Sequence, residues 1–400
     1  MQQRLLILGN NILYEALKNC ESNNKNLDIH YLSTHDVLTK KDLHDYIIQH
    51  RIDYLYPTSI NWRDFIDEAF LKTHNIKTLA VNQHALAIEK DRFFAKTLCD
   101  TYNIAFVDSY AFCNQNNALN FIKKNPAAYV IKNRFSSPMS KVKTTVCTSY
   151  AQTLTLLKQT DCSDGVFLQK YAGQNEAGHT VFINHGKIYP LCTNQEYKKL
   201  YTGNLGETLS TPMGGLIEMD QNDRYQLVKQ LITPLKPWFK KINYCGPLQV
   251  TAIRSNNLWQ VLEFNTRLGV SSGPMIMLSI DNFFNTFKKL HLSKAFDIKI
   301  KANKTYSCLL HIVSHQYPNK NQHYHYPIQK KTHADCAYFW EDVIKKGNSL
   351  HAKQGHSIVN IIASDDNLNA CLKKLYDYAK DIQSYGSFYR TDIGKTLWPL

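Results

Sequence analysis

Three polar side chains alternate with apolar ones in the stretch VLEFNTRLG, Val261 to Gly269. Glu263, Asn265 and Arg267 are two residues apart, and residues at this spacing share one face of a β-strand. A carboxylate, an amide and a guanidinium are therefore expected side by side. Carboxylate and amide oxygens suit Mg²⁺, which usually binds few protein ligands and completes its coordination with a substrate's phosphates. An arginine beyond them can hold a second anion.

The alternative is an exposed strand whose polar face has no ligand. The apolar residues of the stretch argue against that reading, because they indicate a buried strand. They are Val261, Leu262, Phe264 and Leu268. Polar groups in a buried strand need partners. The stretch is therefore interpreted as a metal and anion site.

Two lysines upstream have the chemistry to bind phosphate. Lys132 ends the apolar run YVIK (129–132), and Lys141 follows the flexible stretch NRFSSPMSK (133–141). Ammonium groups act as point charges toward phosphate, so the pair could clamp a triphosphate. Glu176, after the predicted strand VFLQKY, could hold ribose hydroxyls. Taken singly, each of these residues is as well explained by ordinary solvation at a strand end.

The elements that must position these residues change in type along the chain. Strands and helices alternate from the strand at 4–8 to a helix near 89–102, which is typical of an α/β unit. From about 128 strands dominate, and a long helix is expected at 221–241. A hairpin of strands at 248–253 and 259–265 brings in the opening motif. The last hundred residues read as an α+β piece, with a strand at 357–364 and a helix at 367–382.

Bulk properties narrow the class of protein. A chain of 400 residues is expected to form two to four subdomains. No apolar run approaches the roughly 20 residues that a membrane helix needs. The ten cysteines are scattered without a C-x-x-C pair, which favours reduced thiols in a cytoplasmic protein. The net charge of +14 is spread rather than clustered, so a solvated surface that attracts anionic small molecules is favoured over nucleic-acid binding.

The order of these features resembles the ATP-grasp ligases: strand lysine, loop lysine, hinge strand, acidic residue, then E-x-N-x-R. The chain looks most like the phosphoribosylamine–glycine ligase family of purine biosynthesis, and the resemblance runs nearly end to end. The matching segments are KDRFFAKTLCDTYNI (90–104), YVIK (129–132), VFLQKYAGQNEA (166–177), YPLCTNQEYKKL (189–200), VLEFNTRLG (261–269) and FYRTDIG (388–394).

The resemblance implies ATP and Mg²⁺ as cofactors, with Mn²⁺ as an alternative ion. Glu263 and Asn265 would ligate the metal. Arg267 and Lys141 would act in catalysis, and Lys198 would face the acyl phosphate or an acceptor-side anion together with Arg267. The residues implied for nucleotide binding are Lys132, Lys141, Gln169, Lys170, Tyr171, Ala172, Glu176 and Lys198.

The family's reaction joins glycine to phosphoribosylamine. ATP phosphorylates the glycine carboxylate, the amine attacks the acyl phosphate, and phosphate leaves. Cations and positioning supply most of this catalysis. Small-molecule substrates are therefore expected, with no nucleic-acid or membrane partner, and the oligomeric state is left open.

The resemblance also implies an α/β and α+β multidomain fold. An N-terminal Rossmann-like pre-ATP-grasp domain is expected at 1–105 and the ATP-grasp lid at 106–185. The ATP-grasp core with the metal site is expected at 186–297, and a C-terminal α+β domain at 298–400.

Departures from the family gather on its acceptor side. The glycine-rich N-terminal loop is replaced by GNNILYEA (9–16), and PTSINW (57–62) and VSSG (270–273) also differ. The glycine-rich lid loop becomes FSSPMSKVK (135–143), and TLSTPMGG (208–215) is altered. Two alternatives therefore stay open. One is an ATP-grasp ligase with another carboxylate or amine, and the other is a non-catalytic nucleotide-binding relative.

Overall fold

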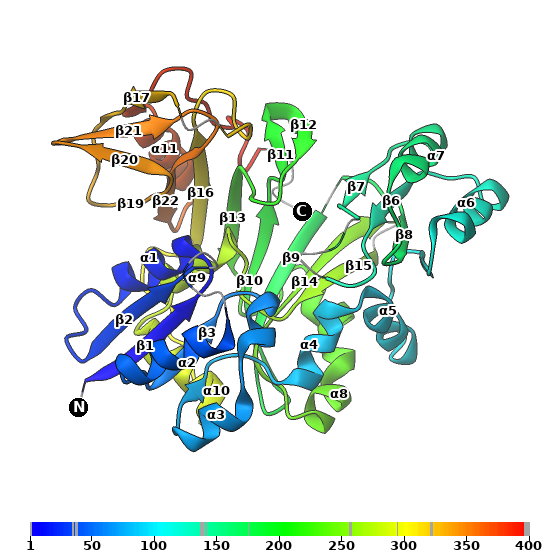
Figure 1. Cartoon of the computed structure of the whole chain (residues 1–400), viewed down its shortest axis with the longest axis horizontal. Coiled ribbons are helices and arrows are strands. Elements are labelled where there is room, and N and C mark those ends of the chain that lie inside the picture. The colour runs from blue at the N-terminus through cyan, green and yellow to red at the C-terminus, as the bar shows by residue number, and fades with distance from the viewer. Residues whose placement is uncertain are drawn as a thin grey trace.

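The structure is a computed structural model of the chain that describes residues 2–33, 36, 39–136, 140, 142–174, 176–255, 258–293, 295–320 and 323–395. Lys141 thus lies outside the described residues. Figure 1 shows a long central sheet with an N-terminal α/β unit below it, a lid at one end and a C-terminal unit above the other end. None of the described helices is long and apolar enough to cross a membrane.

The N-terminal unit is a parallel sheet in the order β2-β1-β3-β4. Residues 5–8 of its first strand are at most 1% exposed, as expected for a parallel strand covered on both faces. Its elements are β1 (Gln3–Leu8), α1 (Asn11–Cys20), β2 (Leu27–Leu32), α2 (Lys40–Gln49), β3 (Tyr54–Pro57), η1 (Ile60–Phe65), α3 (Glu68–Thr73) and β4 (Lys77–Thr78).

The helix expected near 89–102 is two helices, α4 (Gln83–Lys90) and α5 (Arg92–Thr101). Asp91 separates them with an extended backbone, and its carboxylate accepts hydrogen bonds from the backbone N–H groups of Phe93 and Phe94. An aspartate in this position caps a new helix start, which apolar spacing does not reveal.

The lid is a small antiparallel sheet with two helices, in the strand order β5-β8-β6-β7. Its pairing sets Val130 opposite Gln169 and Lys132 opposite Phe167. The elements are β5 (Ser109–Phe112), α6 (Gln115–Lys124), β6 (Tyr129–Lys132), β7 (Thr145–Val146), α7 (Tyr150–Gln159) and β8 (Val166–Lys170).

The central sheet has eight strands in the order β15-β14-β9-β10-β13-β16-β22-β19 and continues from the metal motif into the C-terminal unit. Its strands β9 and β10 form a hairpin that turns at His185 and Gly186, and both of these residues have a positive φ. The strands are β9 (Glu176–Asn184), β10 (Lys187–Glu196), β13 (Gly214–Met219), β14 (Cys245–Ser255), β15 (Leu258–Asn265), β16 (Tyr306–Val313), β19 (Ala337–Trp340) and β22 (Ser357–Asp365).

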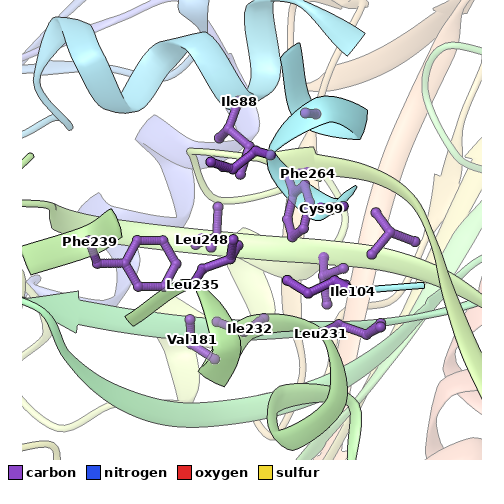
Figure 2. Packing of buried hydrophobic residues seen from close by; sticks show 14 of the residues in the cluster. Ile88, Cys99, Ile104, Val181, Leu231, Ile232, Leu235, Phe239, Leu248 and Phe264 are labelled. Atoms are coloured by element: carbon purple, nitrogen blue, oxygen red, sulfur yellow. The ribbon is translucent and has the colours of Figure 1, made fainter. Parts of the chain in front are cut away.

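The prediction of one long helix at 221–241 was wrong. The segment forms a π-helical turn η3 (Val228–Ile232), a 3₁₀ turn η4 (Thr233–Leu235) and the short helix α8 (Lys236–Lys241). Pro234 and Pro237 each start a new turn, because proline lacks the N–H that a continuous helix requires. Figure 2 shows how Leu231, Ile232, Leu235 and Phe239 from this segment nevertheless pack on one face of the central sheet.

The opposite face of the sheet carries α9 (Ser272–Ser279) and α10 (Phe283–Leu292). Side chains of these helices share a core with β1 and α1, which attaches the N-terminal unit to the central sheet. The remaining elements are the hairpin β11 (Lys199–Tyr201) and β12 (Leu205–Thr208) with η2 (Thr202–Asn204), and the C-terminal β17 (His325–Pro327), β18 (Gln329–Lys330), β20 (Val343–Lys346), β21 (Ser349–Lys353), α11 (Leu368–Ala379) and β23 (Ile382–Gln383).

Candidate active site

A cleft of about 1070 Å³ lies between the lid and the strands β9, β10, β14 and β15. Ser140 and Val142 border it, whereas the expected residue between them, Lys141, lies outside the described residues. Of the residues expected from the sequence, those that line the cleft are Lys132, Gln169, Lys170, Tyr171, Ala172, Glu176, Lys198, Glu263, Asn265 and Arg267.

A bulge in β15 points the metal motif into this cleft. Thr251 of β14 pairs with Glu263, whereas the next residue, Ala252, pairs with Val261. Leu262 is thus an extra residue. Beyond it, the alternation of side chains between the two faces of the strand is shifted by one position. Val261 stays in the core before the bulge, and Glu263 turns to the cleft after it.

Lys132 is held beside this bulge by a buried amide. Its Nζ donates to Oε1 of Gln169 at 2.8 Å, and Nε2 of Gln169 donates to the carbonyl of Leu262 at 3.3 Å. Lys132 is only 7% exposed. Burial lowers the pKa of Lys132 to about 8, against the opposing attraction of Glu263.

Glu263 is surrounded by cations. Its Oε2 lies 3.8 Å from Nη2 of Arg92. Burial opposes its ionisation, but the positive charges of Lys132, Lys198 and Arg92 lower the pKa of Glu263 to about 2. About 28% of the side chain stays accessible to solvent. The carboxylate is therefore ionised at neutral pH and open to a ligand.

Arg267 is tied to α4 by Glu89, a residue that the sequence did not single out. Its Nε donates to Oε1 of Glu89 on α4 at 3.1 Å, and its Nη2 lies 3.4 Å from Oδ1 of Asn265. The second oxygen of Glu89 accepts from the backbone N–H and the hydroxyl of Thr266 at 2.6 and 2.8 Å. Glu89 thus fixes the end of the metal motif and orients its arginine.

Lys198 lies between two carboxylates. Its Nζ is 3.9 Å from Oε2 of Glu176 and 3.8 Å from Oε2 of Glu196. Burial disfavours its charge, but these carboxylates and Glu263 outweigh that effect and raise the pKa of Lys198. Glu176 is therefore engaged by a lysine in this structure, and Glu196 also accepts from the Ser271 hydroxyl at 2.8 Å.

The hinge after β8 offers few free backbone donors. The N–H of Lys170 donates to the carbonyl of Asp108, and that of Tyr171 to the carbonyl of Ala128, both at 2.8 Å. Ala172, which lines the cleft, has no such bond to the backbone of the described residues. Its N–H is the donor in the expected segment best placed to meet an adenine ring.

Further residues in the cleft carry relevant chemistry but were missed in the sequence. Arg92 lies within the family-like segment 90–104, yet nothing in its spacing marked it. Its Nε and Nη1 are buried without a hydrogen-bond partner among the described residues. Gln249 and Thr251 of β14 face the cleft opposite Asn265 and Glu263, and only strand pairing places them there.

This donor set fits a magnesium–nucleotide complex. Glu263 and Asn265 offer two hard oxygen ligands on adjacent cleft-facing positions of β15. The unpaired guanidinium nitrogens of Arg92 and the ammonium of Lys132 offer the charge that phosphate needs.

Comparison with known proteins agrees with this geometry. No protein-family model matches the chain. A phosphoribosylamine–glycine ligase from Fusobacterium nucleatum is 20% identical over 421 aligned positions, which cover 99% of this chain and 93% of that protein. The crystal structure of phosphoribosylamine–glycine ligase from Thermotoga maritima matches with a TM-score of 0.77 at 17% identity, over 98% of this chain and 100% of that one.

This chain is similar to phosphoribosylamine–glycine ligases in sequence and has the ATP-grasp fold. The same fold extends to a biotin carboxylase from Campylobacter jejuni, solved with β,γ-ATP, at a TM-score of 0.69 and 14% identity. That match covers 97% of this chain and 93% of the other. The expected ATP-grasp fold class is thereby confirmed.

Two of the loops that depart from the family pattern, 9–16 and 57–62, meet in space. A side chain at Gly9 would collide with the Trp62 indole and come within 2.7 Å of the Thr58 hydroxyl. Asn10 caps α1 with its own side chain, which accepts from the N–H of Ile12 at 3.1 Å. The N-terminal end of α1 is thus covered by side chains of this chain.

Proposed function

We propose that this chain is an ATP-dependent carboxylate–amine ligase that acts through an acyl phosphate, as expected of a phosphoribosylamine–glycine ligase-like protein. One observation carries the proposal. Lys132, Lys198, Arg92 and Arg267 converge in one cleft on Glu263 and the amide beside it. Such an arrangement serves phosphoryl transfer, where charge neutralisation and positioning supply most of the catalysis.

The reaction forms one amide bond for each ATP cleaved. A phosphoryl group passes to a carboxylate, the amine nitrogen attacks the carbonyl carbon, the bond to phosphate breaks and the amine loses a proton. Bound Mg²⁺, or Mn²⁺ in its place, supplies additional charge neutralisation on the phosphates. Glu263 and Asn265 would hold the metal, Lys132 and Arg92 would hold phosphate oxygens, and Lys198 would face the acyl phosphate.

Glycine and phosphoribosylamine are the first candidate substrates, because similar proteins bear the name phosphoribosylamine–glycine ligase. A second candidate is the same chemistry with a different amine. It is favoured by the filling of the space around Gly9 by Trp62 and Thr58, in loops where the family pattern is lost. An amine without a phosphate group would not need an open helix end there.

A phosphate-release screen would test both candidates. Purified protein with Mg²⁺–ATP is supplied with amino acids and amines in pairs, including glycine with phosphoribosylamine. Phosphate release with that pair, absent with either substrate alone, is expected for the first candidate. Release only with another pair supports the second. Failure of every pair, together with unchanged calorimetric Mg²⁺–ATP binding in Glu263→Gln, would contradict the proposal.

A further inference from the structure

A second polar cluster lies on the face of the central sheet that looks away from the cleft. On β9, Glu176 faces the cleft, and His179, three residues along, faces the other side with Val181. One ring nitrogen of His179 and one carboxylate oxygen each from Asp220 and Asp223 all lie within 4.8 Å of one another. None of the three was expected from the sequence to bind a ligand.

The tautomer of His179 leaves one nitrogen lone pair without a partner. The Thr193 hydroxyl donates to Oδ2 of Asp220 at 3.0 Å, so it can only accept from Nδ1 of His179, also at 3.0 Å. The proton is therefore on Nδ1 and the lone pair on Nε2. Among the described residues Nε2 has no hydrogen-bond partner, although His179 is 0% exposed.

The two carboxylates have no cationic side chain of their own. Within the described part of the chain neither Asp220 nor Asp223 is ion-paired, and the nearby Arg224 pairs with Glu218 instead. They accept backbone N–H groups, Asp220 from Arg224 and Asp223 from Val228 and Lys229. The described residues thus supply no cationic side chain to the two carboxylates, and a ring nitrogen of His179 lies within 4.8 Å of an oxygen from each.

We propose that His179, Asp220 and Asp223 form a binding site for one divalent transition-metal ion, separate from the nucleotide cleft. One imidazole and two carboxylates are ligands that Mn²⁺ and Zn²⁺ share. Donor atoms around such an ion lie about 3.4 Å apart, given bonds of roughly 2.1 Å in a tetrahedral site. Binding would therefore draw Asp223, which is half-buried, toward the sheet. The ion would join β9 to the start of η3 and stabilise the sheet from behind.

Mn²⁺ is the better probe, because the ten free thiols of the chain would bind Zn²⁺. The full-length Glu263→Gln variant serves as the parent protein, so that the cleft does not contribute a metal site. After treatment with a chelator and without nucleotide, free Mn²⁺ is followed by electron paramagnetic resonance during titration. One bound Mn²⁺ per chain is expected, together with a rise in thermal midpoint.

Adding Asp223→Asn tests the assignment, because asparagine caps a helix as well as aspartate but lacks its charge. Mn²⁺ affinity should fall by about tenfold or more, as when groups that support a metal site are lost. Asp67→Asn, at the exposed cap of α3, is the matched control and should leave Mn²⁺ affinity unchanged. A parent protein that binds no Mn²⁺, or a site unaffected by both Asp223→Asn and His179→Gln, would overturn the proposal.

Discussion

Glu263 is the residue on which the charges of the cleft converge. Its carboxylate has a pKa of about 2, because the attraction of four cations outweighs the effect of burial. The same cations would repel a bare metal ion, and the anionic phosphates that they bind would then compensate for this. The site is therefore expected to bind metal and nucleotide together better than metal alone.

Replacing Glu263 with glutamine should reduce Mg²⁺–ATP affinity by at least about 10- to 100-fold, the range seen even for groups that only support metal ligands. Calorimetric titration with Mg²⁺–ATP measures the change. Glu207→Gln, which removes a carboxylate from the cleft wall on β12, is the control and should alter affinity little. Equal losses in the two variants would contradict the metal assignment.

Lys132 is expected to make nucleotide binding sensitive to pH. With a pKa of about 8, the free protein loses this positive charge as pH rises from 7 to 9. The dissociation constant for ATP is expected to increase about tenfold over that interval, because the neutral amine no longer attracts phosphate. Lys132→Arg stays charged and should flatten the profile. A wild-type profile that is already flat would refute the role of Lys132.

The positive charge of Lys132, which is expected to favour ATP binding, is expected to destabilise the folded state. Burial sets the pKa of Lys132 in the folded state below its ordinary value of 10.5, so the unfolded chain binds more protons between about pH 8 and 10.5. The unfavourable contribution of Lys132 is therefore fully present below pH 8 and disappears as pH rises through that window. Lys132→Met should raise the thermal midpoint at pH 7 and lose this benefit by pH 10.5.

At the scale of elements, the hairpin of β11 and β12 is anchored by the C-terminal segment. Arg390 is fully buried, and its Nη1 and Nη2 donate to the Lys199 carbonyl and to Asn204 Oδ1. It also forms two hydrogen bonds with Asp392, at 2.8 and 2.6 Å. The segment FYRTDIG, whose resemblance to the family had no evident chemical reason, thus holds the strand that follows Lys198.

Arg390→Met should destabilise the fold by about 3–5 kcal/mol, because Asp392 would be left as a buried charge without its partner. Ligase turnover should also fall, since the strand next to Lys198 loses its support. Urea denaturation and phosphate release measure the two effects. Lys373→Met removes an exposed ion pair on α11 and should cost about 1 kcal/mol or less. Similar losses in both variants would contradict the anchoring role.

The turn at Gly9 depends on the absence of a side chain. Gly9 has φ +117°, and an added Cβ would collide with Trp62. Gly9→Ala is expected to destabilise the protein by about 1–3 kcal/mol more than Gly347→Ala, since strain and overpacking add at Gly9. Gly347 also has a positive φ, of +57°, but nothing within 4 Å of an added Cβ. Thermal unfolding of the two variants gives the comparison.

At the scale of the whole molecule, the cleft lies where separate units meet. The lid supplies Lys132 and Gln169, the central sheet supplies Glu263, and the link between β10 and β11 supplies Lys198. The helix α4, which follows the N-terminal unit, supplies Glu89. A ligand in the cleft would therefore contact the lid, the central sheet and α4 at the same time.

Mg²⁺–ATP should accordingly stabilise the whole molecule against unfolding. At a nucleotide concentration of 100 times the dissociation constant, linkage predicts about 2.7 kcal/mol. Thermal unfolding with and without Mg²⁺–ATP measures this gain. Glu263→Gln should remove most of it, while Asp67→Asn should retain it. A gain that survives in Glu263→Gln would place the nucleotide elsewhere.

Much of the fold follows from local patterns in the sequence. The buried run at 5–8, the hairpin of β14 and β15, and the helix α11 were predicted because periodicity and turn residues act over short distances. The breaks in the predicted helices at 89–102 and 221–241 were missed. There, capping and proline geometry outweighed the spacing of apolar residues.

The sequence by itself determined which groups can do chemistry: a strand lysine, a pair of hard oxygen ligands and an arginine. Only the tertiary structure decided which way they point. In a regular strand Val261 and Glu263 would share one face, and the bulge at Leu262 sends the first to the core and the second to the cleft. The bulged strand is held in that geometry by its pairing with β14 and by hydrogen bonds with Gln169 and Glu89. These contacts join residues that are far apart in the chain. The type of a side chain is given by the sequence at its own position. The direction in which it points and the charges around it depend on residues that are distant in the chain.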